Sequence, residues 1–398
     1  MSSDPIVIAS YARTPIAAFQ GALAPLHATA LGAAAVKAAV QRAGLSGAAR
    51  AAAIERIYMG CVLSAGLGQA PARQAALFAG LPHSVQATTV NKMCGSGMQA
   101  AILAHEALAA GAVDVIVAGG MESMSNAPYL LPKHRAGARM GHDVVKDSML
   151  LDGLEDAYEP GTLMGVCAEN AARRYDFSRK EQDAYAIESV VRANNAIASG
   201  AFADEVVPLE VATRGGSELV TVDEQPGKAK LDKIASLKPA FLKDGTITAA
   251  SSSSISDGAA ALVMTRRSVA DKLGLNAVAL VRATACHAHE PSWFATAPAP
   301  AMKKAMDKIQ WSASDVDLFE VNEAFAVVAM IAMRELSIPH EKLNVNGGAC
   351  ALGRPIGASG ARILVTLLAA LKRRGGKRGV AGVCLGGGEA TAMALELI

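Results

Sequence analysis

The chain has 398 residues, enough for two or three domain-sized units and a large buried core. Its 38 lysines and arginines nearly balance 36 aspartates and glutamates, and the net charge of +2 favours neither nucleic acid nor a membrane surface as a partner. With 52% hydrophobic residues, 4% aromatics and 37 glycines, the composition excludes a disordered chain, a coiled coil and a disulfide-rich scaffold.

The chain begins with MSSDPIVIAS, which has neither the basic segment nor the apolar segment of a secretory signal. The best apolar stretches are interrupted by Lys37, Arg354 and Arg362, so none reaches the ~20 residues of a membrane span. The cysteines are scattered without a C-x-x-C pair, so the pattern predicts reduced thiols and no metal site. We therefore expect a cytoplasmic protein with no membrane partner and no nucleic-acid partner.

The first α/β pattern surrounds Cys94. A turn of small residues, Cys94 to Gly97, precedes a helical pattern that Gly111 ends, and the apolar strand VDVIVAGG over 113–120 follows directly.

Residues 124–251 change character, because methionine, proline and charged residues are mixed there, and this mixture predicts an inserted loop domain. Ser178 and Glu181 form an S-x-x-E capping box that predicts the start of a helix, and Gly200 predicts its end.

The α/β pattern returns near the C-terminus. A turn over 357–360 opens the helix ARILVTLLAALKRRG, Gly375 ends it, and the strand GVAGVCLGGG follows. The repetition predicts a duplicated α/β fold: an N-terminal half over 1–123 completed by 252–275, and a C-terminal half over 276–398. The nearly continuous apolar strands are typical of a parallel sheet covered by helices on both faces.

Two cysteines are candidate site residues. Cys94 lies at a predicted strand-to-helix turn, where the helix N-terminus favours a thiolate and glycines permit close approach of a substrate. Cys384 ends a strand before LGGG, and ligands of open α/β sheets bind beyond such strand ends. The two cysteines are therefore expected at equivalent places in the two halves, sharing one cleft. The alternative for each is a buried structural cysteine.

Asn322 follows the apolar run VDLFEV and precedes a helical run. It is predicted either to cap that helix or to hold a water or carbonyl oxygen in a site.

Three further signals have structural explanations. The run Gly95 to Ala100 loosely fits a dinucleotide fingerprint, but Asp114 starts a strand and would not reach a ribose. Cys286, His287 and His289 lack the second half of a metal site. The basic run LKRRGGKR is typical of a helix C-terminus rather than a nucleic-acid patch.

Taken together, the motifs resemble those of the thiolases, acyltransferases that make or cleave 3-oxoacyl-CoA through a cysteine thioester. The resemblance runs almost end to end, in the motifs ARTPIAAFQGAL, VNKMCGSGMQA, AGGMESMSNAPY, LKPAF, DGTITAA, ISDGAAA, VNEAFA, NVNGGACALG with PIGASGAR, and CLGGGEATAM. It implies the thiolase fold, a duplicated five-layered αβαβα arrangement with an inserted loop domain, and a homotetramer built as a dimer of dimers.

The resemblance also implies residue roles. Cys94 is similar to the acylated nucleophile, and Cys384 to the cysteine that moves the α-proton. Asn322 would hold a water in one oxyanion hole, and the backbone N–H groups near Cys94 and Gly386 would form a second. The remaining implied residues contact CoA: Leu163, Met164, Ala249, Ser253, Ala324 and Phe325.

The chain departs from the family pattern at Arg354, where the family motif G-H-P-I-G-A-S-G has histidine. An arginine can donate hydrogen bonds to a thioester oxygen but cannot accept a proton. We therefore expect a folded protein that binds CoA and turns over slowly. Leu163 stands where many biosynthetic members carry histidine, and Ser251 replaces a commoner asparagine, a peripheral change.

The sequence thus predicts an acetyl-CoA C-acetyltransferase of fatty acid metabolism with a ping-pong mechanism. Its substrates and products are acetyl-CoA, other acyl-CoA and CoA, and no cofactor or metal is needed, because two cysteines and two oxyanion holes suffice for Claisen chemistry. One alternative is a weakened or inactive protein of this fold that binds acyl-CoA or a partner. Another is a ketosynthase-like condensing enzyme, which usually lacks a second catalytic cysteine like Cys384.

Overall fold

The computed structural model describes residues 4–398, so the first three residues of the predicted N-terminal half lie outside it. The strands are β1 Ile6–Arg13, β2 Ala17–Ala18, β3 Arg56–Gly60, β4 Gln86–Val90, β5 Val115–Ser123, β6 Tyr129–Leu130, β7 Lys146–Asp147, β8 Leu209–Thr213, β9 Gly216–Val220, β10 Ser256–Arg266, β11 Ala279–Ala288, β12 Leu318–Val321, β13 Arg378–Leu385 and β14 Glu389–Leu397. The helices are α1 Ala28–Arg42, α2 Ala48–Ala51, α3 Pro71–Phe78, α4 Ser96–Ala109, α5 Ser148–Gly153, α6 Met164–Arg174, α7 Arg179–Ala198, α8 Arg267–Leu273, α9 Pro298–Asp307, α10 Ala326–Leu336, α11 Ala349–Leu352 and α12 Ser359–Arg374.

The large sheet consists of two half-sheets joined edge to edge. The N-terminal half contributes strands in the order β1-β10-β5-β3-β4, and the C-terminal half contributes β12-β13-β14-β11. Strands β1 and β11 join them through only two residue pairs, Val7 with Leu280 and Ile8 with Ala279. So narrow a junction lets the two half-sheets lie in separate layers.

The half-sheets are mixed, and the expectation of a parallel sheet is wrong in this respect. Strands β3, β4 and β5 pair in parallel, as do β12 and β13, but β10 and β14 run antiparallel to their neighbours. The strands are continuously apolar because both faces of each half-sheet are covered, whichever way a strand runs.

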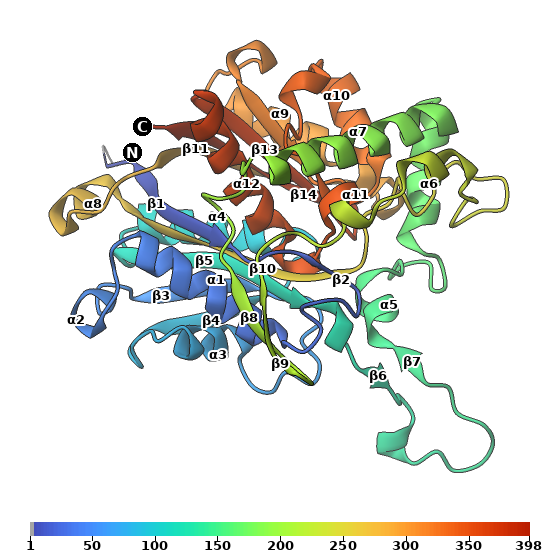
Figure 1. The fold of residues 1–398 in the computed structure, drawn as a ribbon, viewed down its shortest axis with the longest axis horizontal. Helices are drawn as coiled ribbons and strands as arrows, with labels where there is room; N and C mark the ends of the chain where they lie inside the picture. Colours follow the sequence, from blue (N-terminus) through green and yellow to red (C-terminus); the bar gives the residue numbers. More distant parts are fainter. Residues whose placement is uncertain (1–3) are drawn as a thin grey trace.

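The fold has five layers (Figure 1). Helices α1 and α3 cover the outer face of the N-terminal half-sheet, and α9 and α10 lie on the outer side of the C-terminal one. Helices α4 and α12 lie between the half-sheets and pack against each other and against β5, β12 and β13. The five-layered fold implied by the sequence is therefore the one observed.

The two central helices touch where each begins. A Cβ on Gly97 would lie 2.7 Å from the Ala361 nitrogen, and a Cβ on Gly360 would lie 2.5 Å from the Met98 nitrogen. Only glycine permits this approach. The N-terminal turns of α4 and α12, which follow Cys94 and Arg354 in the chain, are thereby brought together.

The predicted helix ends are confirmed. The Ser178 side chain accepts from the Glu181 N–H and the Glu181 side chain accepts from the Ser178 N–H, so the capping box begins α7. Helix α12 ends at Arg374, followed by Gly375 in the left-handed conformation with φ of 69°. The basic run is thus a helix C-terminus, where cations offset the negative end of the helix dipole.

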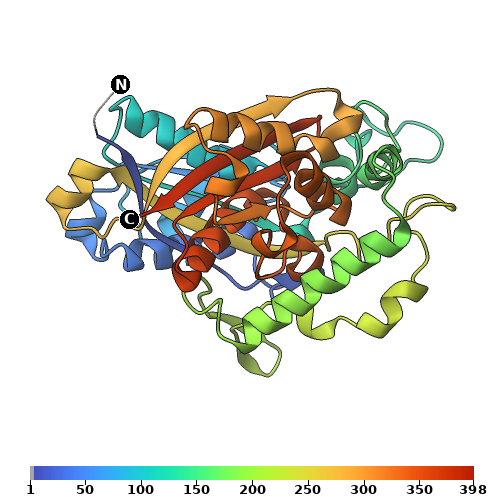
Figure 2. The same ribbon diagram turned by 90° about the horizontal axis from the view of Figure 1, so that it is seen from above.

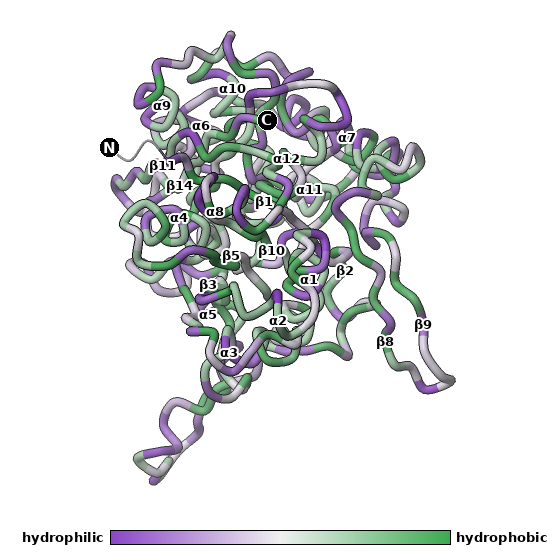
Figure 3. The backbone as a smooth tube through the Cα atoms, turned by 90° about the vertical axis from the view of Figure 1, so that its left-hand side faces the viewer, coloured by the Kyte–Doolittle hydropathy of each residue, from purple (hydrophilic) through white to green (hydrophobic). Residues whose placement is uncertain are grey.

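The segment over 124–251 carries the small hairpins and flanking helices expected of an inserted domain, although its exact boundaries remain a prediction. Helix α7 lies along the flank of the C-terminal half (Figure 2). The arm that carries β6 and β7 projects from the body and has apolar and polar residues interspersed (Figures 1 and 3). Within residues 4–398, no helix is both long enough and apolar enough to cross a membrane.

Candidate active site

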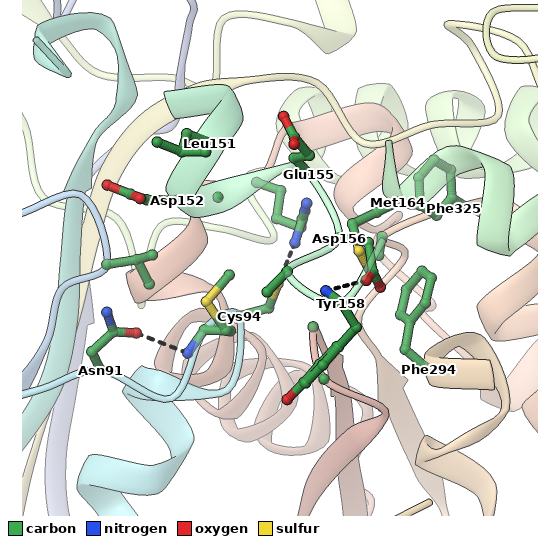
Figure 4. Close-up of a pocket in the computed structure, with 18 of the residues that line it drawn as sticks. Asn91, Cys94, Leu151, Asp152, Glu155, Asp156, Tyr158, Met164, Phe294 and Phe325 are labelled. Atoms are coloured by element: carbon green, nitrogen blue, oxygen red, sulfur yellow. Dashed lines mark hydrogen bonds between the residues drawn. The ribbon is translucent and has the colours of Figure 1, made fainter. Parts of the chain in front are cut away.

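A cavity of about 540 Å³ opens where the two halves and the inserted segment meet (Figure 4). Cys94 lies between Asn91 and Asp152 on one side and Met164 and Phe325 on the other. The lining residues are Val62, Ser64, Asn91, Met93, Cys94, Leu151, Asp152, Gly153, Glu155, Asp156, Ala157, Tyr158, Met164, Phe294, Ala324, Phe325, Arg354, Gly386 and Gly387.

A tight turn presents the Cys94 side chain in front of α4. Met93 has a φ of 47°, and its N–H donates to the Asn91 side chain at 3.1 Å. The Ser96 hydroxyl donates to the Met93 carbonyl and accepts from the Lys92 N–H at 2.9 Å. Cys94 is 6% exposed, so its sulfur lies at the base of the cavity with the N-terminus of α4 directly behind it.

Arg354 reaches this sulfur. Its Nη1 donates to Cys94 Sγ at 2.6 Å and its Nε donates to Ser253 Oγ at 2.8 Å. The backbone N–H of Arg354 donates to the Ser254 carbonyl and to Ser256 Oγ, each at 3.1 Å. Arg354 is only 8% exposed, so fixed contacts align its cation with the Cys94 sulfur.

Cys384 is fully buried on β13. Burial raises the pKa of the Cys384 thiol to about 12; the neighbouring Cys94 adds to the rise and Arg354 opposes it. These couplings indicate that the two sulfurs lie near each other, although Cys384 is not among the residues that line the cavity, so the shared cleft stays a prediction. The predicted equivalence of the two positions is wrong, because β13 follows α12 as β5 follows α4, whereas Cys94 precedes α4. The counterpart of Cys94 in the C-terminal half is the turn before α12.

Asn322 is fully buried, and neither Nδ2 nor Oδ1 of its side chain has a hydrogen-bond partner among residues 4–398. The predicted helix cap is wrong: α10 begins at Ala326, because the intervening residues form a loop whose backbone pairs with Ser251 and Ser252. The backbone N–H of Asn322 donates to the Gly382 carbonyl at 3.0 Å, and this bond fixes the Asn322 backbone to β13, the strand that carries Cys384. A buried amide without a protein partner suits a bound water or a carbonyl oxygen.

The predicted CoA contacts divide into two groups. Met164, Ala324 and Phe325 line the cavity, and Gly386, from the predicted oxyanion hole, lines it too. Leu163, Ala249 and Ser253 do not: Leu163 precedes α6, Ala249 is exposed, and Ser253 binds Arg354 and the Ala324 carbonyl.

Of the aromatic and acidic residues that line the cavity, Phe325 was expected from the motif resemblance, whereas Phe294, Tyr158 and Asp156 were not. Phe294 and Phe325 have ring centroids 6.2 Å apart and form an apolar wall. Asp156 accepts from the N–H groups of Tyr158 and Glu159 at 2.7 and 2.9 Å, which fixes the turn that brings Tyr158 to the cavity. Loop residues of this kind carry no periodic signal by which a sequence could reveal them.

Two buried glutamates hold the loops around the site. Glu122 accepts from the N–H groups of Val62, Leu63 and Gly357, and so links β5 to the turn before α12. Burial raises the pKa of Glu122, and those three hydrogen bonds oppose the rise. Its sequence signal was a charge within an otherwise apolar strand, VIVAGGMES.

Glu323 holds the loop that leads to Arg354. It accepts from Tyr185 Oη and Ser189 Oγ, each at 2.9 Å, and from the Cys350 N–H at 2.9 Å. A Cβ on Gly348 would lie 2.3 Å from the Glu323 carboxyl, so the loop must pass directly over this carboxylate.

No group of three or more histidine, cysteine, aspartate or glutamate residues within 4–398 is arranged to hold a metal ion. His287 and His289 instead form a hydrogen-bonded chain, with Nε2 of one 3.3 Å from Nδ1 of the other. Lys304 Nζ lies 2.9 Å from His287 Nδ1, and His289 Nε2 lies 2.9 Å from the Trp293 carbonyl oxygen.

Family models match nearly the whole chain. The model described as the thiolase N-terminal domain matches residues 6–268, and the model described as the thiolase C-terminal domain matches residues 275–397.

Curated relatives and a solved structure agree with these matches. "Acetyl-CoA acetyltransferase 2" of Arabidopsis thaliana is 50% identical over 396 residues, covering 99% of this chain and 97% of the relative. An acetyl-CoA acetyltransferase of Thiocystis violacea is 46% identical over 397 residues and covers 99% of both chains. The crystal structure of the Bacillus anthracis acetyl-CoA acetyltransferase superposes with a TM-score of 0.95 at 38% identity, covering 99% of both chains.

Proposed function

The chain belongs to the thiolase family, and we propose that it is an acetyl-CoA C-acetyltransferase, which joins two molecules of acetyl-CoA into acetoacetyl-CoA and CoA or reverses that reaction. The observation that carries the proposal is the Cys94 thiol at the base of a cavity, beside the N-terminus of α4, the Arg354 cation and a second thiol, Cys384. Such a site supplies a nucleophile and a separate proton carrier for Claisen chemistry.

In the first half-reaction, the Cys94 thiolate attacks the carbonyl carbon of acetyl-CoA. A carbon–sulfur bond forms to Cys94, and the bond to the CoA sulfur breaks. The Cys384 thiol, whose pKa of about 12 keeps it protonated, gives its proton to the departing CoA thiolate. Free CoA leaves, and the enzyme retains an acetyl group on Cys94 and a thiolate at Cys384.

In the second half-reaction, the Cys384 thiolate removes an α-proton from a second acetyl-CoA. The resulting carbanion attacks the acetyl carbonyl on Cys94, and the bond from that carbon to Cys94 Sγ breaks. Acetoacetyl-CoA leaves, Cys94 is a thiolate again and Cys384 is a thiol again. The protons therefore balance over the cycle, and the two cysteines alternate in charge.

Negative oxygen must be stabilised in both half-reactions. The unpartnered side-chain amide of Asn322 is suited to hold a water that donates to one thioester oxygen. The backbone N–H groups of Cys94 and Gly386 are assigned to the second oxyanion hole, since both residues line the cavity.

Arg354 supplies charge without proton transfer. It donates to Cys94 Sγ at 2.6 Å, and so stabilises the thiolate that starts the cycle. The same contact lowers the nucleophilicity of the Cys94 thiolate, because the sulfur must give up its hydrogen bond to Arg354 before it attacks. In addition, an arginine cannot accept a proton as a histidine can. We therefore propose an enzyme that is acetylated at Cys94 but turns over slowly.

CoA is proposed to lie along Met164, Ala324 and Phe325, with Ser253 beside its pantetheine arm and Leu163 and Ala249 as further contacts. The relatives lend no support to a ketosynthase-like enzyme or to a protein that only binds acyl-CoA or a partner. An assay of thiolysis with acetoacetyl-CoA and CoA, on protein of verified mass, tests the proposal. Turnover that depends on Cys94 supports it, whereas tight CoA binding without turnover would instead support the binding protein.

We propose that the protein acts in the cytoplasm, in fatty acid metabolism, as a homotetramer built as a dimer of dimers. The projecting arm exposes apolar side chains that lack a covering surface within residues 4–398: Tyr129, Leu131, Met140, Val144 and Val145. Met140 is 98% exposed. Apolar area of this kind favours burial against another copy. Light scattering at micromolar concentration is expected to give a tetramer, and a monomer would contradict this.

A further inference from the structure

Two histidines connect to the wall of the active-site cavity without lining it. His287 lies near the end of β11, and His289 follows that strand. His289 Nε2 lies 2.9 Å from the Trp293 carbonyl oxygen. Phe294, the next residue, is 3% exposed and lines the cavity on the same side as Phe325 (Figure 4). The side chain of His289 is therefore linked to the cavity wall through a single peptide group.

The hydrogen bonds of the two imidazoles form a chain with one direction. Lys304 Nζ, on α9, lies 2.9 Å from His287 Nδ1, and His287 Nε2 lies 3.3 Å from His289 Nδ1. An ammonium group can only donate and a carbonyl oxygen can only accept. His287 Nδ1 therefore accepts from Lys304, and its single proton is on Nε2. His289 Nδ1 accepts that proton's hydrogen bond, and His289 Nε2–H donates to the Trp293 carbonyl. The two ends of the chain thus fix both rings as the neutral Nε2–H tautomer.

The backbone of His289 is fixed against another part of the cavity wall. Its N–H donates to the Gly388 carbonyl at 3.0 Å. Gly388 has a φ of 79°, and a Cβ there would lie 2.5 Å from the His289 carbonyl oxygen, so only glycine permits this approach. Gly386 and Gly387, directly before it, line the cavity. His289 thus joins two segments of the wall, one through its backbone and one through its side chain.

The segment that carries Phe294 is bent at the same peptide. The short 3₁₀ helix Pro291–Thr296 is interrupted at Trp293, which has a φ of −99° and a ψ of 17°. The Trp293 carbonyl also accepts from Thr296 Oγ1 at 2.9 Å. Two side-chain donors therefore hold this bend, and the Phe294 ring follows it with its centroid 6.2 Å from that of Phe325.

We propose that His289, in its neutral form, is a positioning residue for thiolysis and condensation, because it holds the Trp293 carbonyl and thereby the Phe294 wall of the substrate cavity. The inference rests on the proposed function, since the wall matters for turnover only if an acyl-CoA substrate occupies the cavity. The chain leaves no place for another proton. A proton on His289 Nδ1 would face the Nε2–H of His287, and two facing donors should displace the His289 ring from the carbonyl. Acid should therefore loosen the wall.

The charged groups around the chain favour the neutral rings. Burial lowers the pKa of His287, and Lys304 and His289 lower it further. Within residues 4–398, neither imidazole has a carboxylate partner that would hold a proton. The other charged side chains on the adjoining segments have different partners: Lys308 with the Thr284 carbonyl, Lys303 with Asp307, Glu389 with Lys92, Glu290 with Ser292, and Arg174 with the Trp293 ring.

Two amide substitutions test the proposal, because each reproduces a different imidazole nitrogen. In His289→Gln the amide nitrogen can replace Nε2 and donate to the Trp293 carbonyl. In His289→Asn the shorter amide replaces Nδ1 and leaves that carbonyl without this donor. His289→Asn should raise KM for acetoacetyl-CoA about 3- to 10-fold at about pH 7.5 and change kcat by less than about 2-fold, since the wall contacts ground state and transition state alike. His289→Gln should keep KM unchanged. His83→Gln, at an exposed histidine outside the cavity, is the control.

The dependence of KM on pH is a readout that a merely structural role would not move. KM of the unmodified protein should rise as pH falls below about 6.5, the ordinary pKa of histidine. His289→Gln donates at every pH and should show a smaller rise. Groups of the substrate and of the rest of the site titrate equally in both proteins, so the ratio of the two KM values isolates His289.

The same effect of His289→Asn and His289→Gln on KM would overturn the proposal, as would the same pH dependence in His289→Gln and the unmodified protein. If His289→Asn does not fold, the second comparison decides alone. Absence of turnover in the unmodified protein would contradict the proposed function instead. Tryptophan emission without substrate then tests the positioning: His289→Asn should shift the Trp293 emission to longer wavelength and His289→Gln should not, whereas identical spectra of the two variants would overturn the proposal.

Discussion

The two cysteines of the site differ in what surrounds each sulfur atom. Cys94 belongs to a turn of the N-terminal half, lines the cavity and has a guanidinium nitrogen 2.6 Å from its sulfur. Cys384 belongs to a strand of the C-terminal half and is fully buried, and its pKa rises to about 12. The same functional group thus has two different environments: one sulfur accepts a hydrogen bond from a guanidinium, and burial favours the protonated form of the other.

Removal of the nucleophile should have the largest effect. Cys94→Ser is expected to lose both Cys94 acetylation and acetoacetyl-CoA formation by at least ~10⁴-fold, since no other thiol combines exposure to the cavity with a cationic partner. Peptide mass spectrometry after an acid quench of the unmodified protein with acetyl-CoA measures the acetyl group. Cys286→Ser, on a thiol outside the cavity, is the control. An acetyl group found on Cys384 or Cys350 would reverse the two roles.

Loss of the proton carrier should separate the two half-reactions. Cys384→Ser is expected to acetylate still at Cys94, yet to form acetoacetyl-CoA at least ~10²-fold more slowly, the usual scale for a positioned acid or base. The acetylation rate and the condensation rate are measured on the same protein. If the acetylation rate and the condensation rate fall by the same factor, Cys94 and Cys384 do not have the separate roles proposed for them.

The anchoring of Arg354 should matter less. Ser253→Ala removes the acceptor of Arg354 Nε and should slow acetylation of Cys94 by about tenfold, the scale of one hydrogen bond to a charged group. Ser252→Ala is the control, because that hydroxyl donates to the Thr248 carbonyl instead.

A double-mutant cycle distinguishes positioning from a general structural effect. In an Arg354→His background, Ser253→Ala should have a much smaller effect on the acetylation rate, since the contact it breaks is already gone. An effect of equal size in both backgrounds would show that Ser253 acts independently of Arg354.

The smallest expected effect is on the pH dependence of stability. The interior of the C-terminal half favours the neutral form of the Glu320 carboxyl as it does that of the Cys384 thiol. Burial raises the pKa of Glu320, on β12 beside β13, from its ordinary 4.5 to about 8, and Arg362 opposes the rise. The folded state therefore binds the proton more tightly, so this group's contribution to stability should fall as pH rises from about 4.5 to about 8. Glu320→Gln should flatten the dependence of Tm on pH in that window. A Glu396→Gln variant is the control and should leave this dependence unchanged, because Glu396 is less buried in its ion pairs with Arg282 and Arg378. An unchanged dependence of Tm on pH in Glu320→Gln would contradict the role given to burial.

The sequence alone allowed most of the framework to be predicted. The capping box of α7, the glycine stop of α12 and the duplicated helix-to-strand units depend on local chemistry and were confirmed. The direction of each strand could not be predicted in this way. Strand β10 pairs with β5, which lies far away in the sequence, and β14 pairs with β13 through a hairpin. Both faces of the half-sheets are buried, so parallel and antiparallel strands have the same apolar sequence pattern.

The site was less predictable than the framework. The motif resemblance placed Cys94, Arg354 and Gly386 at the cavity, but the cavity wall formed by Phe294 and Tyr158 comes from loops fixed by tertiary contacts. Local pattern also placed a helix start at Asn322, where long-range pairing of its loop with Ser251 delays α10 to Ala326.

The most direct test of the account is the steady-state kcat of acetoacetyl-CoA thiolysis for the unmodified protein and for Arg354→His, compared with acetylation of Cys94 in each. If Arg354 stabilises the Cys94 thiolate but cannot shuttle a proton, both proteins should become acetylated, and Arg354→His should raise kcat by at least ~10²-fold. A protein that already turns over rapidly, with kcat unchanged or lowered by Arg354→His, would contradict the roles assigned around Cys94.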